Sequence, residues 1–172
     1  MNLEKEILKE HSRAQMNKIT QYVGNDPVRF KKLVDVFLAG PYRVTQRASW
    51  PLSHCAENHP ELIRPHLKVI LNYLKKPGIH DSVKRNTIRF FRFIEIPKQF
   101  HAQVIDYCFQ YLNDQKEPVA IRVFSMTVLA RIAQFHPDLK AELKIIIEDN
   151  LPYTSAAFRS RARKVLKEIR AN

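Results

Sequence analysis

The stretch Pro118–Leu139, PVAIRVFSMTVLARIAQFHPDL, decides the fold. When successive residues are placed about 100° apart, as on a helix, its apolar side chains fall on two arcs. One arc includes Ile121 and Val128, and polar residues such as Arg122 and Thr127 separate it from the other arc. A helix on the surface of a simple domain needs only one apolar stripe, so two stripes predict a helix that is packed on both flanks.

Prolines set the expected ends of this helix. Pro118 suits the first helical position, where the missing N–H of proline costs no hydrogen bond. Pro137 ends the helix, because the residue before a proline is disfavoured in the α region. The sequence therefore predicts a helix over residues 118–136.

Further copies of this unit occur along the chain. Residues 56–62, AENHPEL, are similar to residues 133–139, AQFHPDL, and the two segments lie about two periods of 38 residues apart. Arginines keep the same period of about 37 to 38 residues, each about one turn into a candidate helix: Arg47, Arg85, Arg122 and Arg159. Such a period is typical of a solenoid, in which each helix pair buries its apolar face only against its neighbours.

On these features the chain resembles the HEAT/armadillo-like family, from about residue 27 to residue 170. The resemblance implies an all-α fold, namely a right-handed α-α superhelix of about four helix pairs that follows an N-terminal helix. We expect residues 1–172 to form a single HEAT-like repeat domain. The predicted parts are an N-terminal capping helix or arm at 1–25 and helix pairs at 27–58, 61–95, 98–136 and 138–170.

The helix boundaries follow from proline, glycine and polar turn residues. Asp26 is a candidate N-cap, with Pro27 at the first helical position. The expected helices are 3–22, then 27–39, 61–76, 98–113 and 138–150 as first helices of the pairs, and 41–58, 81–95, 118–136 and 155–170 as second helices. Apolar residues that repeat between the first helices are expected in the core: Leu33, Ile70, Phe37, Leu74 and Tyr111.

Composition narrows the functional classes. The chain has three glycines among its 172 residues and no glycine-rich phosphate-binding motif. Its two cysteines, Cys55 and Cys108, do not make a disulfide framework, which favours a reducing, cytoplasmic location. No apolar run reaches the ~20 residues of a membrane span, and the N-terminus lacks the apolar segment of a signal peptide. We expect a protein that does not act on membranes and is a monomer.

No catalytic or cofactor constellation is recognisable. The seven histidines lack the spacing that places two metal ligands on one helix face, and there is no C-x-x-C motif. No serine lies in a G-x-S-x-G motif, and no pair of carboxylates stands out. The sequence therefore predicts a non-enzyme without cofactor or metal.

The net charge of +12 at pH 7 points to polyanionic partners, although lysine and arginine can also simply solvate the outer faces of a helical protein. The resemblance implies that the second helix of each pair lines a concave face. Basic and aromatic residues of these helices would then form a candidate binding face: Arg43, Arg47, Trp50, His54, Arg85, Arg89, Arg92, Arg122, Arg159 and Arg163. The alternative is that the arginines at the repeat period are structural and pair with carboxylates such as Asp35, Asp81, Asp106 and Glu117.

Trp50 has two interpretations. It could be an aromatic platform in the groove, as in the DNA-alkylation-repeat glycosylases, a distant branch of the HEAT-like family. His54 stands a turn later, where that branch would need a carboxylate, and this departure argues against glycosylase activity. The other interpretation is a core residue beside the proline kink at Pro51.

Three functions remain in order of preference. The first is a non-enzymatic binding or scaffold module that presents a basic concave face to an acidic protein or peptide. The second is a nucleic-acid binder that holds phosphates through the same arginines without reading bases. The third is an enzyme similar to the DNA-repair glycosylases. Fold alone does not decide between them.

Overall fold

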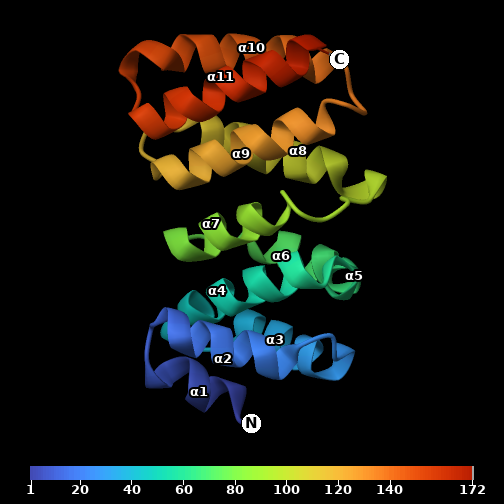
Figure 1. Cartoon of the computed structure of the whole chain (residues 1–172), viewed down its shortest axis with the longest axis vertical. Helices are drawn as coiled ribbons and strands as arrows, with labels where there is room; N and C mark the ends of the chain where they lie inside the picture. The colour runs from blue at the N-terminus through green and yellow to red at the C-terminus, as the bar shows by residue number, and fades with distance from the viewer. Residues whose placement is uncertain (172) are drawn as a thin grey trace. The chain divides into compact units, whose positions relative to one another are not determined.

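The chain is an all-α protein, as predicted, in this computed structural model (Figure 1). The structure describes residues 1–171, except for the side chains at positions 153 and 171. No strand occurs in this described range. The chain divides into two compact units, Met1–Glu95 and a second unit that begins at Ile96. Each unit is described on its own below.

The first unit begins with two short helices, α1 (Leu3–Lys9) and α2 (Arg13–Val23). The expectation of one helix over residues 3–22 was therefore wrong. The break occurs because the Ser12 hydroxyl accepts a hydrogen bond from the Gln15 backbone N–H and starts a new helix. Leu3 and Ile7 of α1 are buried, so α1 packs on the unit although its apolar stripe is narrow.

The first helix pair consists of α3 (Pro27–Ala39) and α4 (Tyr42–Asn58). As predicted, Asp26 caps α3 and Pro27 is its first residue, with the Asp26 carboxylate accepting from the backbone N–H groups of Val28 and Arg29. The turn between the helices is tight at Gly40, where a Cβ atom would lie 2.6 Å from the Val36 carbonyl oxygen. Only glycine fits there without a shift of the backbone.

The second pair is less regular than expected. A continuous helix over residues 61–76 was predicted, but the structure has α5 (Pro60–Ile63), a 3₁₀ turn η1 (Arg64–His66) and α6 (Leu67–Tyr73). Pro65 lies in this 3₁₀ turn, where a regular helix would be broken by its missing N–H. The second helix, α7 (Asp81–Phe90), ends earlier than the predicted residue 95. The predicted core positions Leu33, Ile70, Phe37 and Leu74 are buried.

The second unit contains η2 (Lys98–Phe100), α8 (His101–Asn113), α9 (Val119–Ile132), α10 (Asp138–Asn150), η3 (Leu151–Tyr153) and α11 (Ala156–Ala171). The predicted packing of α9 on both flanks is confirmed, because α9 contacts α8 as well as α10 and α11. Ile121 and Val128 are buried, and so is Tyr111 of α8.

The ends of α9 differ from the prediction. The helix ends at Ile132, and its last predicted residues form a turn in which Phe135 is 62% exposed. Pro118 occupies the N-cap rather than the first helical position, and Pro137 lies just before α10 at that helix's N-cap. The prolines thus punctuate the pair as expected, but one of them starts the next helix rather than ending α9.

Candidate protein-binding surface

In the first unit, the second helices α4 and α7 are joined by a row of polar contacts. Asn86 Nδ2 donates to Ser49 Oγ at 3.0 Å, and Gln46 Nε2 lies 3.0 Å from His80 Nε2. Ser49 and Asn86 are buried, so their hydrogen bonds satisfy groups that water cannot reach. This row fixes α7 along α4 and sets where their remaining side chains emerge.

Arg89 belongs to this row. Its guanidinium donates to Ser53 Oγ at 2.8 Å and pairs with the Glu57 carboxylate. Burial of the His54 ring lowers the pKa of that histidine, and the positive charge of Arg89 lowers it further. Arg89 and His54, both predicted for the binding face, are half-buried and engaged with neighbouring side chains. Arg92, half-buried at the end of α7, lies over the Phe93 ring at 5.3 Å.

Arg43 and Arg85 are the predicted residues of this unit that are exposed. Arg43 lies in the first turn of α4, and Arg85 lies midway along α7. Their side chains make no ion pair within residues 1–171.

Arg47 and Trp50 of α4 contact the N-terminal segment of the chain. Arg47 Nη1 donates to the carbonyl oxygen of Leu8 at 2.9 Å, which caps the end of α1. The Trp50 ring lies 5.4 Å from the His11 ring, and both line a small enclosed space with residues of α2. Trp50 is half-buried and Pro51 is buried. This placement supports the core interpretation of Trp50 rather than an open aromatic platform.

Arg122 of α9 is inside the second unit and is only 5% exposed. Its Nε donates to the Leu112 carbonyl oxygen at 3.1 Å and its Nη2 to Asn150 Oδ1 at 2.7 Å. The guanidinium also lies 4.8 Å above the Phe158 ring. The pKa of Arg122 is lowered, because burial of the guanidinium outweighs the opposite effect of the Asp114 charge. Arg122 thus ties α9 to α8, α10 and α11, and these hydrogen bonds go to a carbonyl and an amide rather than to the carboxylates that were expected.

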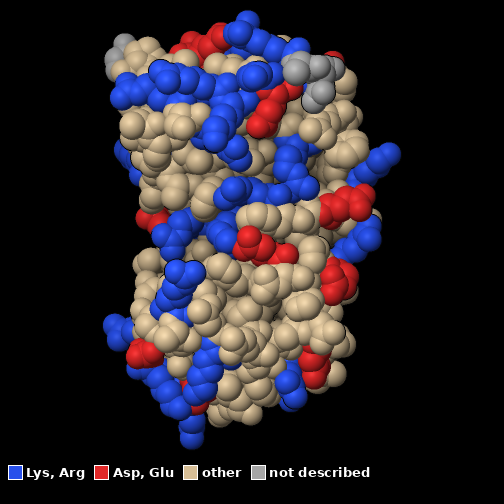
Figure 2. Space-filling view, viewed as in Figure 1, with Lys and Arg blue, Asp and Glu red and all other residues tan. Residues whose placement is uncertain are grey.

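Helix α11 carries the most exposed cations of the second unit. Its inner face is fixed by the buried Phe158, Ala162 and Val165, and Arg161 Nε donates to Thr127 Oγ1 of α9 at 2.7 Å. Its outer face carries exposed basic residues that share one side of the helix: Arg159, Arg163, Lys164, Lys167 and Arg170. Figure 2 shows them as a band of positive charge along α11.

Most of these cations are unpaired. The side chains of Arg159, Arg163, Lys164 and Lys167 make no ion pair within the described part of the chain. Arg170 approaches Glu148 of α10 at 3.6 Å, but the two side chains are 66% and 42% exposed. An exposed pair of this kind is worth about 0–1 kcal/mol, so it leaves Arg170 available to another carboxylate.

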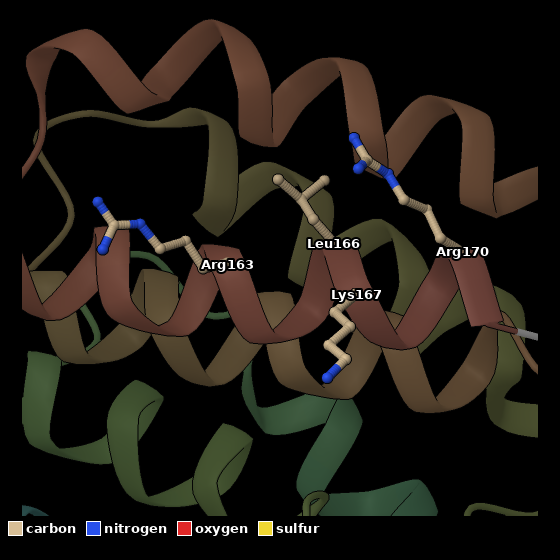
Figure 3. Close-up of a pocket in the computed structure, with 4 residues that line it drawn as sticks. All are labelled: Arg163, Leu166, Lys167 and Arg170. Atoms are coloured by element: carbon tan, nitrogen blue, oxygen red, sulfur yellow. The ribbon is translucent and has the colours of Figure 1, made fainter.

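A shallow pocket of about 430 Å³ lies on this helix, lined by Arg163, Leu166, Lys167 and Arg170. In Figure 3, Arg163, Leu166 and Arg170 leave α11 toward α10, and the side chain of Lys167 points away from α10. The binding face predicted from the sequence included neither Leu166 nor Lys167. Leu166 is only half-buried. The spacing of Lys167 from Arg163, four residues on, is the signal that could have found it.

The histidines form one close pair in the second unit. His101 Nδ1 lies 2.9 Å from His136 Nε2, and His101 Nε2 lies 2.8 Å from the Ile96 carbonyl oxygen. A carbonyl oxygen only accepts, so His101 Nε2 donates to Ile96, and when the His101 ring is neutral its Nδ1 accepts from His136 Nε2. Both contacts of the buried His101 are therefore satisfied as hydrogen bonds. Across residues 1–171, no group of three or more His, Cys, Asp or Glu side chains could hold a metal ion.

Three comparisons with known proteins bear on the class of this chain. A family model described as HEAT repeat domain matches residues 3–169. No curated protein and no solved structure matches the chain.

In the described part of the protein, no helix combines the length and apolar character needed to cross a membrane.

Proposed function

Because the chain belongs to the HEAT repeat domain family, whose members generally serve as protein-binding scaffolds, we propose that it is a non-enzymatic module that binds an acidic protein surface. The observation that carries this proposal is the row of exposed cations on α11. Repeats of this type offer extended surfaces built from successive second helices, and α11 is a second helix.

The cations of α11 favour binding over a purely solvating role. Solvating lysines and arginines are commonly interspersed with carboxylates, whereas Glu168 is the acidic residue of this helix. Arg159, Arg163 and Lys167 follow one another at a spacing of four residues, or about 6 Å along the axis. Unpaired cations at this spacing create a local positive potential that attracts and orients an acidic partner.

Six of the remaining predicted residues divide into two groups. Arg43 and Arg85 are exposed in the first unit and are proposed as a smaller basic patch on α4 and α7. Arg47, Arg89, Arg122 and His54 are engaged with neighbouring groups, so the proposal gives them a supporting role within the repeats.

A charge-reversal experiment tests this proposal. The double variant Arg159→Glu/Arg163→Glu is expected to bind a polyglutamate peptide at least about tenfold more weakly than the unchanged protein, because two attractive contacts become repulsive. The matched control is Lys98→Glu/Lys116→Glu, which changes the net charge equally at exposed positions of η2 and the α8–α9 loop. Equal loss in both variants would mean that net charge alone drives the binding.

Nucleic-acid binding is the outcome that would contradict this proposal. Titration with single- and double-stranded DNA and RNA over a salt series distinguishes the two, since an interface with about six phosphate contacts loses about a thousandfold in affinity between about 50 and 200 mM salt. Tighter binding of nucleic acid than of acidic peptide, with such a slope, would replace the protein-binding proposal.

A further inference from the structure

The pocket on α11 has an apolar centre between basic walls. Arg163, Leu166 and Arg170 lie at i, i+3 and i+7, so all three project from one side of the helix, as Figure 3 shows. The Cα atoms of Arg163 and Arg170 are separated by about 10 Å along the helix axis, with the half-buried Leu166 between them. Lys167 also lines the pocket, and its side chain points away from α10 in Figure 3.

An apolar side chain at this position distinguishes between acidic ligands. A phosphate backbone or an extended run of glutamates offers charge and no apolar group to cover Leu166. An acidic amphipathic helix offers both, because its own i, i+3 or i+4, and i+7 positions lie on one face and repeat the spacing of Arg163, Leu166 and Arg170.

We propose that this pocket binds an acidic amphipathic helix of a partner protein, with a leucine-like side chain seated on Leu166 and carboxylates on Arg163 and Arg170. The inference rests on the proposed function and names its partner class. The weak, exposed contact between Arg170 and Glu148 is replaced by the partner's carboxylate. Lys167 contributes a further cation beside the pocket. Guanidinium groups suit these positions because they contact a carboxylate through two parallel hydrogen bonds.

The test compares three synthetic peptides of equal length, of which the first two also carry equal charge. The first is a helix-forming peptide with glutamates at i and i+7 and a leucine between them. The second has glutamine in place of that leucine, and the third is polyglutamate. The full-length protein is expected to bind the leucine peptide at least about tenfold more tightly than the glutamine peptide, as expected for covering one leucine side chain.

Variants of the protein test whether the pocket causes the preference for the leucine peptide over the glutamine peptide. Leu166→Ala is expected to remove most of the tenfold preference for the leucine peptide over the glutamine peptide. The matched control is Leu139→Ala, which shortens another half-buried leucine on α10 and should leave the preference intact. Circular dichroism spectra of both variants verify that the helices are retained, and the glutamine peptide keeps the test valid should Leu166→Ala fold poorly.

The outcomes separate this inference from the proposed function. Equal affinity for the leucine and glutamine peptides, with polyglutamate still bound, overturns the apolar anchor and leaves the acidic-partner proposal standing. Absence of binding to all three peptides overturns both. Tighter binding of single-stranded DNA than of the leucine peptide, or self-association of the protein that Leu166→Ala abolishes, assigns the pocket to a different occupant and also overturns the inference.

Discussion

At the scale of single residues, burial decides which arginines can act on a partner. Arg122 and Arg163 have the same side chain, but Arg122 is 5% exposed and engaged with Leu112, Asn150 and Phe158, whereas Arg163 is exposed. Removing a buried guanidinium leaves the Leu112 carbonyl and the Asn150 amide without their donor. Removing an exposed one leaves only a shorter side chain in water.

This contrast predicts different effects on stability. Arg122→Ala is expected to lower the free energy of unfolding by about 3 kcal/mol, because it breaks a buried hydrogen-bond network and leaves a cavity. Arg163→Ala should change it by less than about 0.5 kcal/mol. Urea denaturation of both variants measures these changes. A small loss of unfolding free energy for Arg122→Ala would contradict its structural role and favour a role in binding.

The two cysteines give a second prediction at this scale. Burial raises the pKa of Cys55 and of Cys108 to about 12, so both thiols stay protonated at neutral pH. The thiolate is the reactive form, and it is further shielded here by the core. Both cysteines should therefore react with a thiol reagent such as DTNB only after urea unfolding. Rapid reaction of the native protein would show that one of these helices opens.

At the scale of elements, α1 acts as a cover for α4. It contacts α4, its Leu3 and Ile7 are buried, and Arg47 of α4 donates a hydrogen bond to the carbonyl oxygen of Leu8 in its last turn. His11, just after α1, lies against Trp50. Since Trp50 is the one tryptophan of the chain, its fluorescence reports on whether α1 is in place.

Detaching α1 should therefore shift the emission of Trp50 to longer wavelength. Ile7→Asp places a charge at a position that is 2% exposed, which disfavours packing of α1 on the unit. The control is Leu8→Asp, at a position in the same helix that is 43% exposed, and it should leave the emission unchanged. An unchanged spectrum for Ile7→Asp would mean that Trp50 is shielded without α1.

Ion pairs at α1 make this element sensitive to strong acid. Hydrogen bonds from Lys9, Lys18 and Gln15 lower the pKa of Glu6 from 4.5 to about 2. A carboxyl group with a depressed pKa in the folded state contributes stability above its unfolded pKa and loses it as pH falls through the folded value. The link between α1 and α2 should thus persist at pH 5 and weaken from about pH 4.5 toward pH 2. An NMR titration of the Glu6 carboxyl measures this, and an ordinary pKa would contradict it.

At the scale of the whole molecule, the repeat pattern of the sequence was sufficient to predict the all-α HEAT-like fold. The period of prolines and arginines located the helix pairs, and the two apolar arcs predicted the packing of α9 on both flanks. Local hydrogen bonding was harder to foresee. Ser12 starts a second N-terminal helix, and Pro65 converts the expected continuous helix into a 3₁₀ turn, because each effect depends on a single cap or a single missing donor.

The candidate site was predictable only in part, for a physical reason. Helical spacing shows which arginines share a face, but it does not show which of them find a partner within the fold. Arg89 meets Ser53 and Glu57 of the preceding second helix, and Arg122 meets Asn150. These contacts join residues roughly one repeat apart, so they depend on how adjacent helices are packed. Most exposed cations of α11 differ from these arginines because they lack such partners within the described part of the chain.

The central claim is that this row on α11, rather than the net charge of +12, binds an acidic partner. The most direct measurement is an NMR titration of the isotopically labelled protein with a polyglutamate peptide, in which each backbone amide reports on its own surroundings. We predict that chemical-shift changes concentrate on α11 between Arg159 and Arg170. Changes spread evenly over the exposed lysines and arginines of both units, or centred away from α11, would contradict the claim.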